Sequence, residues 1–110
     1  MKIHVHLHYA TQYGENLFVK TELRQGGNTI SGEYPLTYLN DTLWHGAVEL
    51  DAAPGDLLQY HYEWRDRFGN KRTESGIRQI ALDTTGPLEL YDYWMPMASV
   101  QNAFETQAFR

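Results

Sequence analysis

The stretch LLQYHYEWRD, residues 57–66, alternates apolar and polar side chains along most of its length. A period of two is the pattern of a β-strand with one buried face. The large side chains that share one face of this strand are Leu58, Tyr60, Tyr62 and Trp64. We therefore predict a long strand whose large rings pack into the core of an all-β protein.

The same period recurs in the rest of the chain. In IHVHLHY, residues 3–9, apolar side chains alternate with His4, His6 and His8. Turn-forming sequences such as QYGEN, RQGGNTISG, LNDT, AAPGD, RFGN and TTGP separate the runs closely enough to indicate hairpins. The sequence thus predicts an antiparallel β-sandwich of about seven or eight strands. These strands are expected near residues 3–9, 16–22, 35–39, 43–50, 57–66, 71–75, 77–82 and 87–93.

Chain length, cysteine content and net charge limit the classes of function that the chain can have. The 110 residues fit one domain, which we place at residues 1–94, and the alternation is lost in residues 95–110, which we interpret as a linker. The chain has no cysteine, which excludes disulfides and thiolate chemistry and fits a cytoplasmic location. A net charge of -5, with scattered basic residues, argues against nucleic acid and anionic membrane as partners.

The three histidines near the start raise the question of a metal site. Alternation places His4, His6 and His8 on one strand face, where neighbouring imidazoles could share a zinc ion. A zinc site also needs a third ligand and hydrogen-bonded support for each imidazole, and a first strand is usually an exposed edge. We therefore predict a solvated strand face, with no metal and no cofactor.

Motifs of catalysis are absent from the sequence. There is no HExxH motif, no serine, histidine and aspartate grouping in a recognisable context, and no lysine with serine or threonine after RQGGN to complete a phosphate loop. No pair of acidic residues is placed across a cleft by the pattern. We predict no catalytic residue in this chain.

Two aromatic residues stand outside the core pattern. Tyr13 lies in a turn beside Gly14, and Trp44 follows the loop YLNDT at the start of a strand. We expect both rings to be exposed. Exposed rings bind sugars well, because a sugar has apolar C–H faces and a rim of hydroxyl groups.

Four segments in order resemble the starch-binding domains of carbohydrate-binding module family 20. They are the aromatic residue before Gly-Glu-Asn in TQYGENLFV, the tryptophan of LWHGAVEL, the strand LLQYHYEWRD and the stretch TESGIRQIAL after it. The resemblance covers residues 3–85. It implies an immunoglobulin-like β-sandwich that binds α-1,4-linked glucans such as starch, glycogen, maltooligosaccharides or cyclodextrin.

The resemblance also implies site residues. One family site uses the aromatic residue before Gly-Glu-Asn and the tryptophan of the middle strand, here Tyr13 and Trp44, with Tyr38, Asn40 and Asp41 as loop partners. The family's second site uses two tryptophans and a lysine. The lysine position falls on His61, a tryptophan position falls on Thr73 before Glu74, and the other tryptophan has no counterpart. This second site is expected to be degenerate, so that one glucan chain binds per domain.

The segment YDYWMPMASVQNAFETQAFR resembles the connection between tandem starch-binding domains in 4-α-glucanotransferases of the amylomaltase-like type. This resemblance implies a non-catalytic module that holds glucan for a transferase domain elsewhere in the polypeptide. The alternative is a structural sandwich in which Trp44, Tyr93 and Trp94 dock onto the following domains. An enzymatic role for the chain itself ranks third.

Overall fold

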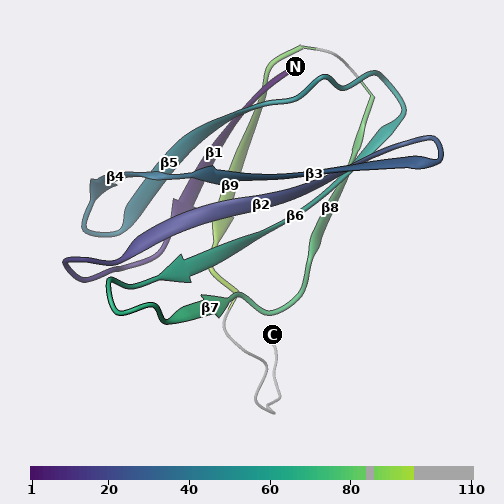
Figure 1. Ribbon diagram of the computed structural model, residues 1–110. Helices are drawn as coiled ribbons and strands as arrows, with labels where there is room; N and C mark the ends of the chain where they lie inside the picture. Colours follow the sequence, from purple (N-terminus) through teal and green to yellow (C-terminus); the bar gives the residue numbers. More distant parts are fainter. Residues whose placement is uncertain (84–85, 96–110) are drawn as a thin grey trace, which may run out of the picture.

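The computed structural model describes residues 1–83 and 86–95 of the chain. These residues form nine β-strands and no helix, in two layers (Figure 1). The strands are β1 (Lys2–His8), β2 (Asn16–Gln25), β3 (Asn28–Pro35), β4 (Thr37–Asn40), β5 (Leu43–Glu49), β6 (Asp56–Arg65), β7 (Lys71–Thr73), β8 (Arg78–Leu82) and β9 (Leu88–Tyr93). The predicted all-β sandwich is confirmed. None of the described segments is a helix long and apolar enough to cross a membrane.

One sheet has the strand order β4-β5-β1-β9, and the other has the order β3-β2-β6, with β7 and β8 both pairing with β6. All neighbours are antiparallel except β1 and β9, which run parallel. The parallel pair departs from the predicted all-antiparallel arrangement. Turn sequences predict only the pairing of strands that follow one another in the chain. Strand β9 comes instead from the far end of the described chain and lies beside β1.

The core lies between the inward faces of the two sheets. Ile3, Val5 and Leu7 of β1 are almost fully buried and face the long strand β6. On β6 the rings of Tyr60, Tyr62 and Trp64 are buried, as the alternation of residues 57–66 predicted. Burial of these large side chains supplies most of the driving force for folding, because it removes apolar area from water.

A polar network joins the sheets within this core. Asp92 of β9 accepts hydrogen bonds at Oδ2 from the hydroxyl groups of Tyr60 at 2.9 Å and Tyr62 at 2.7 Å. Arg78 of β8 completes it with ion pairs to Asp92 and Glu74. Burial raises the pKa of both tyrosines, and the hydrogen bonds to the Asp92 carboxylate raise it further. The network therefore ties the edge strand β9 to the opposite sheet.

The hairpin β2–β3 is longer than the sequence indicated. The sequence RQGGNTISG predicts one long turn, but β2 continues to Gln25 and β3 begins at Asn28, with Gln25 opposite Asn28. The turn is only Gly26 and Gly27, and Gly26 has a φ of 58°, which favours glycine. Because β3 is an edge strand with a largely exposed face, it lacks the apolar alternation by which the other strands were recognised.

The strand that carries His4, His6 and His8 is predicted at a sheet edge. In the structure this strand, β1, lies between β5 and β9. The rings of His6 and Tyr91 stack with centroids 4.5 Å apart, and those of His8 and Tyr93 stack at 4.6 Å. The histidines do lie on the outward face, but they are half-buried by these neighbours. Their position follows from the return of β9, which the local pattern of residues 3–9 does not show.

The predicted linker at residues 95–110 lies, apart from Met95, outside the described residues. Met95 itself is attached to the domain. Its N–H donates to Oε1 of Glu74 at 3.0 Å, and its carbonyl accepts from the N–H of Ser75 at 3.0 Å.

Candidate functional site

A hollow of about 490 Å³ opens at the end of the sandwich where the β1–β2 loop and the β4–β5 turn meet, which is the left side of Figure 1. We call it the Tyr13 hollow. The residues that line it are Thr11, Gln12, Tyr13, Gly14, Glu15, Asn16, Tyr38, Asp41 and Trp44. Four of the five residues expected at the first site thus lie around one hollow, although they come from segments about 25 residues apart or more in sequence.

The β1–β2 loop presents the Tyr13 ring to solvent. The N–H of Gln12 donates to Oε1 of Glu15 at 2.7 Å, and the N–H of Glu15 donates back to the carbonyl of Gln12 at 3.1 Å. Gly14 has a φ of 88°, which a residue with a side chain rarely adopts. The loop is therefore closed on itself, and Tyr13 at its tip is 94% exposed, as the sequence predicted.

Tyr38 forms a second ring at the hollow. It is 51% exposed on β4, and its hydroxyl donates to Oδ1 of Asp41 at 2.8 Å. This hydrogen bond to the carboxylate raises the pKa of the Tyr38 phenol above its ordinary value. The second carboxylate oxygen of Asp41 can accept a hydrogen bond from a ligand hydroxyl group.

Trp44 differs from the expectation, because its ring is only 4% exposed. Its strand places it opposite Leu7, on the inward face, and its Nε1 donates to Oγ1 of Thr11 at 3.2 Å. The ring meets Tyr38 edge-on, with centroids 5.6 Å apart. Trp44 thus forms the base of the hollow and belongs to the core. The alternation of Trp44, Gly46 and Val48 was a signal for this burial, since Val48 is clearly a core residue.

Asn40 is not among the residues that line the Tyr13 hollow. Its Oδ1 accepts hydrogen bonds from the N–H of Thr42 at 3.0 Å and from the Thr42 hydroxyl at 3.3 Å. These are the bonds by which asparagine closes a turn on its own backbone. The structure therefore gives Asn40 a local role in shaping the β4–β5 turn.

Sequence reasoning missed several residues of the hollow, namely Thr11, Gln12, Glu15 and Asn16. Thr11 fixes the Trp44 indole, and Glu15 closes the loop that carries Tyr13. Each of these residues therefore positions one of the two rings. They surround Tyr13 in the stretch TQYGEN, and this clustering of polar residues around an exposed ring was the available signal.

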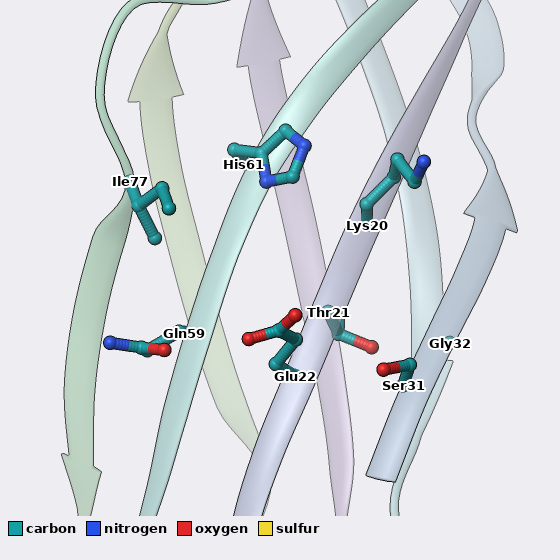
Figure 2. Close-up of a pocket in the computed structure, with 8 residues that line it drawn as sticks. All are labelled: Lys20, Thr21, Glu22, Ser31, Gly32, Gln59, His61 and Ile77. Atoms are coloured by element: carbon teal, nitrogen blue, oxygen red, sulfur yellow. The ribbon is translucent and has the colours of Figure 1, made fainter. Parts of the chain in front are cut away.

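The predicted second site lies on the outward face of the other sheet. His61 lines a shallow groove of about 290 Å³ between β2, β3 and β6, which we call the His61 groove (Figure 2). Its other lining residues are Lys20, Thr21, Glu22, Ser31, Gly32, Gln59 and Ile77. Apart from the imidazole, the groove has no ring, so it offers polar groups and one aliphatic side chain to a ligand.

The other two residues expected at this second site do not join His61. Thr73 is exposed on β7, opposite Glu63. The side chain of Glu74 is fully buried, accepts the N–H of Tyr62 at 3.0 Å and forms the ion pair with Arg78. Glu74 therefore serves the core network instead of a surface site, because a buried carboxylate needs these donors and cannot reach a ligand in solvent.

No protein-family model and no curated protein sequence matches the chain. The solved structures that share its fold include two glucoamylases. The glucoamylase of Hormoconis resinae matches with a TM-score of 0.64 and 25% sequence identity, over 94% of this chain and 18% of that chain. The glycoside hydrolase family 15 glucoamylase from Hypocrea jecorina matches with a TM-score of 0.64 and 22% identity, over 86% of this chain and 17% of that chain. This chain thus spans less than a fifth of each glucoamylase.

Proposed function

We propose that this domain binds α-1,4-glucan, in the form of starch, glycogen, maltooligosaccharide or cyclodextrin, at the Tyr13 hollow and performs no catalysis itself. The observation that carries this proposal is that two exposed rings, Tyr13 and Tyr38, line one hollow together with the Asp41 carboxylate. The fold shared with part of two glucoamylases and the sequence resemblance to starch-binding domains support the same ligand class.

The chemistry of the hollow suits a neutral sugar. A glucose ring stacked on Tyr13 removes its apolar C–H face from water, and burial of apolar area is favourable. Its hydroxyl groups can then bond to Asp41 and to the polar side chains of the β1–β2 loop. Because the hollow is open and covers only part of each sugar, we expect dissociation constants on the order of tens of micromolar to millimolar.

In the proposed setting, residues 1–94 are the glucan-binding module and residues 95–110 connect it to the rest of a longer polypeptide. The resemblance of the last twenty residues points to a 4-α-glucanotransferase as that polypeptide. The module would hold substrate near the transferase site and so raise the local glucan concentration.

A docking role is the second candidate, and the exposed side chains of Tyr91 and Tyr93 favour it. These rings lie on the outward face of β9, away from the Tyr13 hollow. Trp44 cannot take part in docking because it is buried, and Trp94 is half-buried against Tyr9, with centroids 4.5 Å apart. A domain that only docks would bind no glucan in isolation.

The deciding experiment is calorimetric titration of the 110-residue chain with maltoheptaose and β-cyclodextrin. We expect binding by the natural sequence and its loss in Tyr13→Ala and Tyr38→Ala. We expect its retention in Tyr91→Ala, which removes a tyrosine whose exposure, 66%, lies between those of Tyr38 and Tyr13 and which does not line the hollow. No heat change and no shift of amide resonances with either glucan would reject glucan binding and leave the docking role.

A further inference from the structure

The turn between β6 and β7 is held by one aspartate. Oδ1 of Asp66 accepts the N–H groups of Phe68 and Asn70, each at 2.9 Å, and Oδ2 accepts Nδ2 of Asn70 at 2.8 Å. The N–H of Asp66 donates to the carbonyl of Asn70 at 3.1 Å, and Gly69 has a φ of 91°. Four hydrogen bonds within five residues fix the shape of this turn.

The rigid turn carries an apolar ring into solvent. Phe68 is 75% exposed, and it has no hydroxyl group to interact with water. An exposed ring on a mobile loop could fold back onto the surface, but the bonds to Asp66 restrain the backbone on both sides of Phe68. Its exposure is therefore built into the turn, and it is prepared to stack on a ligand at little further cost in conformational entropy.

Arg67 connects this ring to Tyr13. The guanidinium carbon of Arg67 lies 5.9 Å from the centre of the Tyr13 ring and 5.1 Å from the centre of the Phe68 ring. Arg67 also lies close to Gly14, where a Cβ would be 3.2 Å from Cδ of Arg67. The β1–β2 loop and the β6–β7 turn also lie side by side in Figure 1.

We propose that Phe68 is a second stacking platform, which extends the glucan site from the Tyr13 hollow across Arg67 and makes the domain prefer longer α-1,4-glucans to disaccharides. This inference rests on the proposed function. A long chain would stack one glucose on Tyr13 and a later one on Phe68, with hydroxyl groups between them accepting hydrogen bonds from the Arg67 guanidinium. We expect a disaccharide stacked on Tyr13 to leave Phe68 uncovered, because the Arg67 side chain contacts both rings and separates the two platforms.

The test compares maltose with maltoheptaose in the 110-residue chain and in Phe68 variants. In Phe68→Ala we expect the dissociation constant for maltoheptaose to rise about five- to tenfold, because one stacked ring is lost. The dissociation constant for maltose is expected to change less than about twofold. Phe68→Tyr should keep the preference, because the flat ring remains. Phe68→Leu should lose it although the side chain stays apolar, and Ile30→Ala, which shortens another exposed apolar residue on β3, should have no effect.

The outcomes separate this inference from the proposed function. Suppose that the natural sequence binds maltoheptaose through Tyr13, but that Phe68→Ala lowers the affinity for maltoheptaose no more than the affinity for maltose. The second platform is then wrong, and glucan binding at the Tyr13 hollow stands. If the natural sequence binds neither sugar, both proposals fail. Thermal unfolding of each variant shows that it is folded, and we expect little change because Phe68 is exposed.

Discussion

The ring of Tyr38 meets the ring of Trp44 edge-on, with 5.6 Å between centroids and 82° between planes. Edge-to-face contact is a favourable geometry for two aromatic rings. One partner is a core residue and the other is half in solvent. The contact therefore couples the proposed ligand surface to the hydrophobic core, and the two residues are expected to respond differently to substitution.

Trp44→Ala is expected to lower the free energy of unfolding by about 3–5 kcal/mol, the usual effect of removing a large buried ring. Tyr13→Ala is expected to change it by less than about 0.5 kcal/mol, because that side chain is in solvent. Urea unfolding followed by circular dichroism measures both. Equal stability of the two variants would contradict the core position of Trp44.

Asp92→Ala is expected to destabilise the domain by about 3 kcal/mol, because it leaves two buried tyrosine hydroxyl groups and Arg78 without their shared acceptor. Glu49→Ala is the matched control, since that carboxylate is 69% exposed and forms an ion pair with the chain's amino terminus at 3.5 Å. The same unfolding measurement applies. A loss no larger than that of Glu49→Ala would show that the network contributes little.

The Asp66 carboxyl is expected to titrate below its ordinary pKa of 3.8, because the side-chain hydrogen bond from Asn70, aided by backbone N–H groups, favours the charged form. Because its pKa is lower in the folded state, the charged Asp66 carboxylate stabilises the fold when the pH is above the ordinary pKa. This stabilisation is lost as the pH falls through the lowered pKa. Carboxyl carbon resonances report the midpoint. Asn70→Ala should move the midpoint upward, and a midpoint at or above 3.8 in the natural sequence would refute the role of the turn.

One glucan chain is expected to bind per domain. The residues that line the His61 groove are polar or charged apart from Gly32 and Ile77, and none is a tyrosine, tryptophan or phenylalanine on which a sugar could stack. A neutral hydrogen bond contributes only about 0.5–1.5 kcal/mol after exchange with water, and one to the charged Lys20 or Glu22 about 1.5–3 kcal/mol, so these bonds alone are expected to hold a glucan weakly. Calorimetric stoichiometry with maltoheptaose should therefore be one and should not change in His61→Ala. A second binding event that survives Tyr13→Ala and disappears in His61→Ala would reverse this expectation.

His4, His6 and His8 are expected to bind no zinc at low micromolar concentration. His6 and His8 each stack on a tyrosine, and the described residues contain no group of three or more histidine, cysteine, aspartate or glutamate side chains placed to hold a metal ion. Imidazole resonances followed during zinc addition provide the measurement. A joint shift of all three, with a rise in melting temperature, would indicate a site.

Much of the fold was contained in local sequence. The period of two in residues 3–9 and 57–66 determined the strands and which side chains face inward, because successive side chains of a strand point to opposite faces. The exposure of Tyr13 was equally local, since a glycine with positive φ follows it at a loop tip. The grouping of Tyr13, Tyr38 and Asp41 was implied by the family resemblance and not by the pattern of the chain.

Only the tertiary structure decided which strands are neighbours. The parallel return of β9 beside β1 converts the expected edge strand into an interior one and partly covers His6 and His8. Glu74 becomes a core carboxylate because Arg78 and the N–H of Tyr62 bind it there. Phe68 is connected to Tyr13 through Arg67, which contacts both rings. These outcomes depend on contacts between residues distant in sequence or on loop geometry. A periodic pattern fixes the faces of each strand but carries no information on the partner that covers them.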